Sequence, residues 1–423
     1  MLCSVRTKGD TGSVRLRGVG GPRVRYFAVL ALSTLSVALM SCSTTNLPPI
    51  EVGDKSFQIE KDEQELWRNA EQLERRIEMS RIGYSDPQLE AYLSSVTERL
   101  PAGGIHIAGV RPRVKVILHP LLNAYALPNG AIYLHSGLLV RIQNEAQLAA
   151  ILGHELTHVS RRHALKEMRS AQNRATFLRI LQTTLAVTGL IGVAQLTGDI
   201  GALWALAAVR GYSRELETEA DEAGLQAVVE AGYDPKEAPK VFEHLQRELD
   251  ERKVAEPFFF GTHPRLQERI ANYRKLLETQ YADRAKEARR LTNAEEFLSR
   301  IGQALLDNAV LDLNIGRVKT AQASIEQHLI RQPHSPHAHY LLGDLHRRSG
   351  QGEQYTQRAL AAYQEAARLD PSFAEAHREL GLLYRAQNRP EQARAELALY
   401  LALKPEAVDA PIVRGYLAEL GPP

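Results

Sequence analysis

The sequence predicts a mostly α-helical protein with a small β-sheet, followed by a domain of α-helical repeats. Three observations lead to this fold class. Apolar residues recur with helical spacing over several long stretches between residues 60 and 290. Polar and apolar residues alternate, as is typical of strands, only in short runs near residues 113–134. After about residue 291, a pattern typical of paired helices recurs along the chain.

The periodicity places the elements of the first domain in order. Two helices come first, and two strands follow, the second of them directly after the turn signal Asn129-Gly130. A helix with the candidate site comes next, and a later helix is closed by Gly232 and Pro235. The expected ranges are 60–81 and 87–100 for the first helices, 113–118 and 131–134 for the strands, and 145–166 and 214–231 for the later helices.

The length and charge of the chain limit its domain number and its partners. With 423 residues it is too long for one ordinary domain, so two or three domains are expected. Its 52 Lys and Arg residues nearly balance 50 Asp and Glu residues, and the net charge is +2. Because no basic excess is available to contact a phosphate backbone, we expect no nucleic-acid partner.

The N-terminus has the features of a secretory signal. Several arginines precede a short apolar run at residues 26–39, and Ser41 then stands directly before Cys42. This order resembles the bacterial lipoprotein signal, in which the cysteine is lipidated and becomes the mature N-terminus. The alternative is an ordinary cleaved signal with an incidental cysteine. We expect a lipoprotein signal peptide over residues 1–41, a polar tether over 42–60, and a membrane anchor on lipidated Cys42.

Cysteine usage excludes two classes of chemistry. The chain has two cysteines, Cys3 and Cys42. Signal cleavage removes the first and lipidation uses the second, so the mature chain would hold neither a disulfide nor a free thiol. Disulfide stabilisation and thiol catalysis are therefore not expected.

An apolar stretch at residues 175–209 is rich in small residues and is interrupted by glycines and by Asp199. It is predicted to be either a buried helical hairpin or a lid or membrane-surface hairpin near the substrate channel. A transmembrane span is not expected, because Gln182 and Gln195 also break the apolar runs.

The motif that carries chemistry is His154-Glu155-Leu156-Thr157-His158. Residues four apart share one face of a helix, so both imidazoles can reach one metal ion. Glu155 projects nearby and can take a proton from the catalytic water, which zinc makes more acidic. The alternative is a surface helix with two histidines that have other partners.

A third ligand is expected from the acidic segment that begins the helix at 214–231. Glu217 and Asp221 are four residues apart and share a face, so one can bind the metal while the other orients a ligand histidine. Glu215 and Glu219 point elsewhere and are interpreted as a solvated acidic helix start.

The last third of the chain fits tetratricopeptide repeats. Residues 372–384, with Ala393, Leu397 and Pro405, match one repeat, and Leu342-Gly343 with Tyr363 and Pro371 match another. A degenerate third repeat is expected over about 301–333. Such helix pairs of about 34 residues bury their faces only by stacking. The alternative is a set of unrelated helical hairpins.

Together these motifs resemble the HtpX-like and BepA-like zinc metallopeptidases, which include the prenyl-protein proteases. The resemblance covers about residues 66–277. The matching segments are NAYALPNGAIYLHSGLL at 123–139, HELTH at 154–158, SR at 213–214, ETEAD at 217–221 with Gly224, and THP at 262–264.

This resemblance implies a zincin-type metallopeptidase domain over residues 61–285 and a tetratricopeptide-repeat domain over 290–423. It makes Glu217 the third ligand of one zinc ion per chain and Asp221 the partner that orients the metal histidines. The BepA-like branch also carries repeats after its protease. It acts in the bacterial periplasm on quality control and assembly of outer-membrane proteins.

The same branch suggests a role for His263. Its matching histidine can occupy the open zinc position and hold the enzyme latent; the alternatives are a structural loop histidine or a stabiliser of the oxyanion. Other histidines, including His163, lack metal spacing to a partner, and His334, His337 and His339 are expected on the repeat surface.

Two functions follow as hypotheses. The first is a zinc endopeptidase acting on unfolded or misassembled outer-membrane proteins, with the repeats binding the assembly machinery. The second is a mainly non-proteolytic chaperone with a latent zinc site.

Because Ser43 rather than an acidic residue follows Cys42, the chain is expected on the periplasmic face of the outer membrane. An extended peptide is expected to pair with a free edge of the strand at 131–134.

Overall fold

A computed structural model describes residues 58–80, 82–101, 112–170, 212–252, 266–287 and 290–421, together with Leu47. The expected signal peptide, Cys42, the apolar stretch at 175–209 and His263 all lie outside the described residues. The part of the chain before residue 290 is called the N-terminal region below, and the part after it the repeat region.

The N-terminal region is built around one mixed sheet of four strands. Its strands are β1 (Gly83–Tyr84), β2 (Arg113–Ile117), β3 (Ala124–Ala126) and β4 (Ala131–His135), in the order β1-β2-β4-β3. β2 and β4 run parallel, with Val114 opposite Ile132, and the outer pairs are antiparallel. The expectation that β4 has a free edge is therefore wrong, because β2 and β3 occupy both of its sides.

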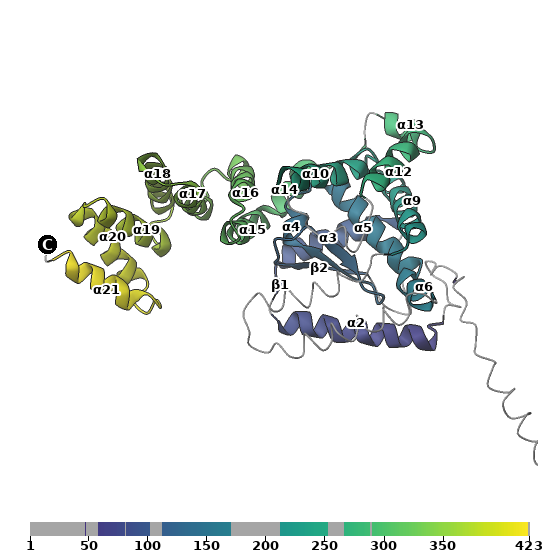
Figure 1. The fold of residues 1–423 in the computed structure, drawn as a ribbon, viewed down its shortest axis with the longest axis horizontal. Helices are drawn as coiled ribbons and strands as arrows, with labels where there is room; N and C mark the ends of the chain where they lie inside the picture. The colour runs from purple at the N-terminus through teal and green to yellow at the C-terminus, as the bar shows by residue number, and fades with distance from the viewer. Residues whose placement is uncertain are drawn as a thin grey trace, which may run out of the picture. The chain divides into compact units, whose positions relative to one another are not determined.

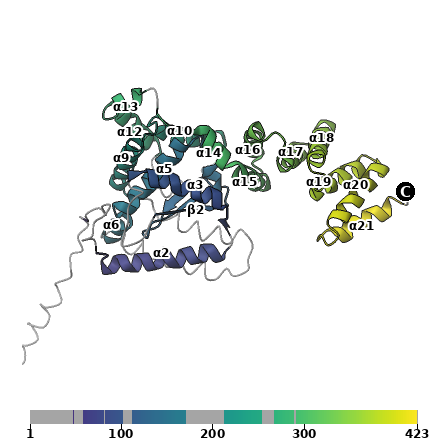
Figure 2. The ribbon, with the colours of Figure 1, turned by 180° about the vertical axis from the view of Figure 1, so that it is seen from behind.

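Helices cover both faces of this sheet (Figures 1 and 2). α2 (Lys61–Met79) lies against one face, where Leu73 and Ile77 pack on Ala131 and Tyr133 of β4. α3 (Pro87–Arg99) and α5 (Glu145–Ser160) lie on the other face. Alternate side chains of β4 therefore enter two different cores, which explains why all five of its residues are buried.

α5 is the central helix of the N-terminal region. All 16 of its residues are buried. It packs against α3, α9 (Arg214–Glu230) and α10 (Glu237–Arg252), and α12 (Leu266–Glu278) in turn contacts α9 and α10. The short helices α4 (Ser136–Leu139) and α13 (Ala282–Lys286) also belong to this region. A helix that is buried on every side can hold polar side chains only if partners surround them.

The helix expected over 145–166 is divided in two. α5 ends at Ser160, and α6 (His163–Arg169) begins after Arg162, whose φ of 56° is left-handed. The guanidinium of Arg162 donates two hydrogen bonds, of 2.9 and 2.6 Å, to the buried carboxylate of Glu63 on α2. This bidentate pair fixes a backbone conformation that costs energy for any residue with a Cβ.

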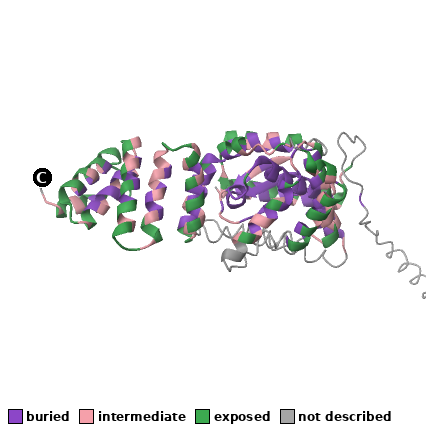
Figure 3. Cartoon of the chain, turned by 90° about the horizontal axis from the view of Figure 1, so that it is seen from above, coloured by how far each residue is buried: buried purple, intermediate pink, exposed green. Residues whose placement is uncertain are grey.

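The repeat region consists of α14 (Ala294–Arg300), α15 (Gly302–Asn314), α16 (Val318–Arg331), α17 (Pro336–Ser349), α18 (Glu353–Leu369), α19 (Ala374–Ala386), α20 (Pro390–Leu403) and α21 (Ala410–Glu419). Most contacts lie within consecutive pairs, α15 with α16, α17 with α18, and α19 with α20. Buried residues fill the interior of the N-terminal region, whereas the repeat helices alternate buried and exposed faces (Figure 3).

Glycines allow the paired helices to approach. A Cβ on Gly343 of α17 would lie 2.4 Å from the ring of Tyr363 on α18, and one on Gly381 would lie 2.6 Å from Leu397. The Tyr363 hydroxyl also donates a 2.6 Å hydrogen bond to Asp344. The Leu-Gly pair and the tyrosine that predicted a repeat are therefore in direct contact.

Polar side chains join the first repeat helix to the N-terminal region. Arg141 donates a 2.9 Å hydrogen bond to Asp312 of α15, and both side chains are buried. Asn308, one turn earlier on α15, contacts Asp312 at 2.9 Å and Ser136 of α4 at 2.8 Å. The described part of the chain contains no helix with the length and hydropathy of a membrane span.

Candidate metal centre

The start of α5 is fixed by a buried polar cluster. The side chain of Asn144 caps the helix by accepting a 2.9 Å hydrogen bond from the backbone N–H of Gln147. Glu145 then accepts hydrogen bonds from the Tyr92 and Tyr233 hydroxyls at 2.7 Å each, and from Arg99 at 2.6 Å. Burial raises the pKa of Glu145, but these donors outweigh that effect and hold its pKa below the ordinary value.

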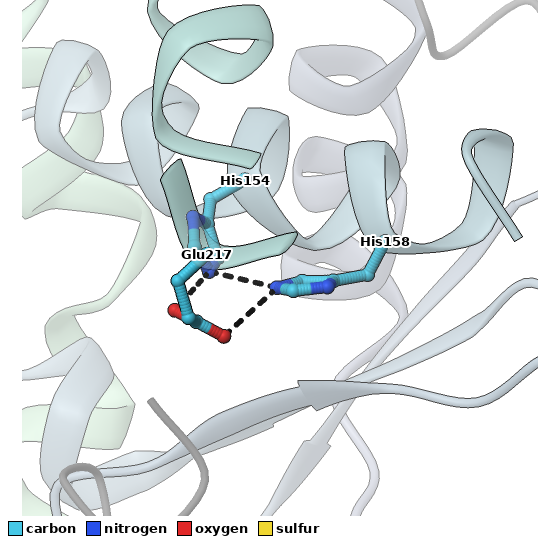
Figure 4. A group of neighbouring side chains, drawn as sticks. All are labelled: His154, His158 and Glu217. Carbon is cyan, nitrogen blue, oxygen red and sulfur yellow. Dashed lines mark hydrogen bonds and ion pairs between the residues drawn. The ribbon is translucent and has the colours of Figure 1, made fainter. Parts of the chain in front are cut away.

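His154 and His158 follow on the same helix, one turn apart. Both are buried, and their Nε2 atoms lie 3.0 Å from each other. The Glu217 carboxylate of α9 completes the group, with one oxygen 3.5 Å from Nε2 of His154 and the other 3.6 Å from Nε2 of His158 (Figure 4). Within the ranges that the structure describes, no other group of three or more His, Cys, Asp or Glu side chains is close enough to share a metal ion.

The spacing and chemistry of this group fit a small tetrahedral ion. Zinc binds imidazole nitrogen and carboxylate oxygen at about 2.0–2.2 Å, so two of its tetrahedral ligand atoms lie about 3.3 Å apart. The three separations here, 3.0, 3.5 and 3.6 Å, lie on either side of that value. Two neutral nitrogens and one carboxylate also match a catalytic zinc site with three protein ligands.

Two glycines bring Glu217 to the histidines. A Cβ on Gly224 of α9 would lie 2.8 Å from the backbone nitrogen of His154, and one on Gly153 would lie 3.0 Å from the Gly224 carbonyl oxygen. α5 and α9 therefore cross with their backbones in contact. Glu217 lies about two turns before this crossing, so the close approach sets how far its carboxylate reaches toward the imidazoles.

Asp221 lies one turn after Glu217 and faces the other nitrogen of His154. Its Oδ1 is 2.9 Å from Nδ1 of His154, the geometry expected when a histidine bound through Nε2 donates its remaining N–H to a carboxylate. Helix spacing alone left open which of these two acids contacts the metal, and the family resemblance assigned Glu217. In the structure Glu217 faces both Nε2 atoms and Asp221 faces one Nδ1.

Arg269 and Tyr273 of α12 hold Asp221, and no sequence pattern pointed to either residue. Arg269 donates to both oxygens of Asp221, at 2.6 and 3.0 Å, and the Tyr273 hydroxyl donates at 2.8 Å. The guanidinium lies 4.4 Å from the centre of the Phe242 ring. Burial acts to lower the pKa of Arg269, but the carboxylates of Asp221 and Glu217 raise it overall, so Arg269 remains charged.

His158 has different partners. Its Nδ1 lies 2.9 Å from Nδ1 of His163, whose Nε2 lies 3.2 Å from the Glu219 carboxylate. The ring of Tyr212 stacks on His158 at 4.0 Å between centroids. Glu219, interpreted as part of a solvated helix start, is about one-third exposed and contacts both His163 and Lys166. Glu215 is exposed. The described residues of the repeat region do not belong to the group formed by His154, His158 and Glu217.

Glu155 lies between the two histidines in sequence and is buried on α5. Metal-dependent hydrolysis of a peptide requires a metal site and a general base. Here the two imidazoles and the Glu217 carboxylate can form the metal site, and the Glu155 carboxylate can act as the base. The structure therefore brings His154, Glu155, His158, Glu217 and Asp221 to one buried place from α5 and α9.

Comparisons with known proteins agree with this architecture. The model of peptidase family M48 matches residues 87–277, and tetratricopeptide-repeat models match residues 306–354 and 352–397. The β-barrel assembly-enhancing protease of Escherichia coli K12 is 31% identical over 198 residues, which are 45% of this chain and 39% of that protein.

Other relatives include mitochondrial metalloendopeptidases. The protein named OMA1 is 33% identical over 140 residues in Arabidopsis thaliana, or 33% of this chain and 27% of that protein. In Saccharomyces cerevisiae it is 30% identical over 174 residues, or 40% of this chain and 48% of that protein. The matches thus span about half or less of each of these relatives. This chain contains a peptidase family M48 domain at residues 87–277, with tetratricopeptide repeats after it.

Proposed function

We propose that this chain is a zinc-dependent endopeptidase. The observation that carries the proposal is the buried group formed by His154, His158 and Glu217, with Glu155 on the same helix turn. Each chain would hold one zinc ion through these three side chains. Asp221, held by Arg269, would keep the His154 ring in the orientation that binding requires.

The chemistry follows from the residues around the site. A zinc ion held there supplies Lewis acidity and lowers the pKa of water toward neutrality. Glu155 acts as the general base, because it takes a proton from the water that attacks the scissile carbonyl. The same carboxyl group returns that proton to the amine that leaves, so Glu155 ends the reaction ionised, as it began.

The substrate is proposed to be an unfolded segment bound as an extended strand. β3 is an outer strand of the sheet, and it contacts α5, the helix of the metal ligands. A peptide that pairs with β3 binds through its main chain, which gives weak sequence specificity and requires an unfolded partner. β3 thus takes the role that the sequence assigned to β4.

The biological setting is proposed from the relatives and the N-terminus. Bacterial relatives are named for enhancing β-barrel assembly, which supports unfolded or misassembled outer-membrane proteins as substrates. The signal pattern before Cys42 supports a lipid-anchored protein on the periplasmic face of the outer membrane. The repeats would bind the assembly machinery, because stacked helix pairs present an extended surface for protein partners.

A second candidate is a mainly non-proteolytic assembly factor, which the repeat region favours. In this case the zinc site would be latent, and His263 is the proposed fourth ligand that excludes water. Two proposed roles of His263, latent ligand and oxyanion stabiliser, predict opposite results for one variant. His263→Ala raises proteolysis if His263 holds the enzyme latent, and lowers it about 100-fold or more if His263 stabilises the oxyanion.

The deciding experiment is degradation of an unfolded outer-membrane protein by the purified mature chain. We expect wild type to hold about one zinc per chain and to cleave, and Glu155→Gln to keep the zinc but lose cleavage. Asp283→Asn on the exposed helix α13 serves as a matched carboxylate control that cleaves like wild type. Equal cleavage by wild type and Glu155→Gln would refute the endopeptidase, and full zinc in His158→Ala would refute the site.

A further inference from the structure

We propose that His163, held by Glu219, is a positioning residue for the metal ligand His158. This inference rests on the proposed zinc site and names two residues that neither the metal motif nor the acidic motif assigned. Nδ1 of His154 faces the Asp221 carboxylate, and Nδ1 of His158 faces the imidazole of His163. Its ring is oriented instead by a second imidazole.

The contacts form a continuous line away from the metal ligands. Nδ1 of His158 lies 2.9 Å from Nδ1 of His163, and Nε2 of His163 lies 3.2 Å from Oε2 of Glu219. His163 is completely buried, whereas Glu219 is about one-third exposed and contacts Lys166 at 3.3 Å. The line therefore begins at a buried metal ligand and ends at a solvated carboxylate.

The positions of the protons follow from this geometry. A histidine that binds metal through Nε2 carries its proton on Nδ1, so His158 is the donor in the contact with His163. Nδ1 of His163 must then accept, which places the proton of the neutral His163 ring on Nε2. That N–H faces Glu219, an acceptor. One consistent set of tautomers therefore satisfies every nitrogen of both rings.

The break between α5 and α6 makes the contact possible. In an uninterrupted helix, residues five apart are rotated by about 140° around the axis, so His158 and His163 would point in different directions. The left-handed conformation of Arg162 turns the chain and returns His163 to the face of His158. The buried Arg162–Glu63 pair holds that turn, so α2 supports the metal site indirectly.

The two histidines thus have unequal support. His154 donates directly to a carboxylate, while His158 donates to a neutral ring that a carboxylate polarises. Removing such a partner takes away the acceptor that Nδ1 of His158 faces and loosens the orientation of the ring. Loss of an outer partner of this kind typically weakens metal binding about 10–100-fold.

The test measures metal binding directly, on the full mature chain, with Zn²⁺ in competition with a chelator and with Co²⁺ as a spectroscopic probe. His163→Leu removes the acceptor and should weaken Zn²⁺ binding about 10–100-fold. His163→Asn places an amide oxygen near the former Nδ1 and should restore most of the affinity. The visible absorption of bound Co²⁺ should change in the leucine variant and return toward wild type in the asparagine variant.

A matched pair on α9 tests the outer end of the line. Glu219→Ala should weaken Zn²⁺ binding, by less than His163→Leu, while the same change at exposed Glu222 should leave it unchanged. The proposal fails if His163→Leu binds like wild type, or if the leucine and asparagine variants lose affinity equally. Wild-type protein that binds no Zn²⁺ would instead refute the proposed function, and His158→Ala marks complete loss of the site.

Discussion

Arg269 donates hydrogen bonds to both carboxylate oxygens of Asp221, so the acid that faces His154 is itself fixed by a residue 48 positions later in the chain. Arg269 also lies 3.6 Å from Glu217, and all three side chains are buried. Two buried carboxylates next to each other repel unless a cation separates them. The guanidinium therefore places a buried positive charge next to both carboxylates.

The first prediction concerns that guanidinium. Arg269→Gln should destabilise the metal-free protein by about 3–5 kcal/mol, because it leaves two buried carboxylates without their cation. Arg269→Lys should recover only part of this loss, since an ammonium lacks the planar fork that contacts both oxygens. Urea unfolding in the presence of a chelator measures both. Unchanged stability of Arg269→Gln would contradict the role, and Arg274→Gln, on the exposed face of α12, is the matched control.

The second prediction concerns the helix crossing. Gly224→Ala should destabilise the protein by about 1–3 kcal/mol and weaken Zn²⁺ binding, because a Cβ there would lie 2.8 Å from the His154 backbone nitrogen. Gly415→Ala in α21 meets nothing within 4 Å and should be stabilising by about 0.5–1 kcal/mol. Thermal unfolding and chelator competition test both variants. A Gly224→Ala protein with wild-type zinc affinity would show that the crossing does not position Glu217.

The third prediction concerns pH. Because the pKa of Glu145 is lower in the folded state, its ionised form stabilises the protein above its unfolded pKa, which is about 4.5. That contribution is lost as pH falls through the lower folded pKa. Glu145→Gln should therefore be less stable than wild type at pH 7, and the difference should shrink below about pH 4.5. Urea unfolding of metal-free protein at pH 7, 5 and 4 measures the difference, and a gap that grows toward low pH would contradict the sign.

The fourth prediction concerns the junction with the repeats. Arg141 and Asp312 form a buried pair between α15 and the N-terminal region. Arg141 also lies 3.3 Å from Glu248, and Asp312 lies 3.9 Å from Arg317. Arg141→Met and Asp312→Leu each remove a charge from this buried network and should each cost about 3–5 kcal/mol. The double variant should cost less than the sum, because the two residues interact directly. A double-mutant cycle by urea unfolding tests this, and additive losses would mean that the two residues act independently.

The sequence by itself determined what depends on local spacing. Residues four apart share a helix face, so the HELTH motif placed His154 and His158 side by side, and the same spacing paired Glu217 with Asp221 on a second helix. The fold class, the metallopeptidase family and the repeats were confirmed, because each has short-range patterns. Helix boundaries were wrong where a tertiary contact intervened, as at Arg162, whose left-handed turn depends on Glu63 from α2.

Tertiary structure alone decided which partners surround the metal ligands. Arg269 is 115 residues from His154, and Glu219 is 56 residues from His163, so no local periodicity connects them. It also decided that β4 is a central strand. β3 ends five residues before β4 begins and pairs with it, but a strand of three residues is too short to show a clear alternating pattern in the sequence. A helix encodes its own faces in sequence, but the groups that a buried face meets depend on how the whole chain packs around it.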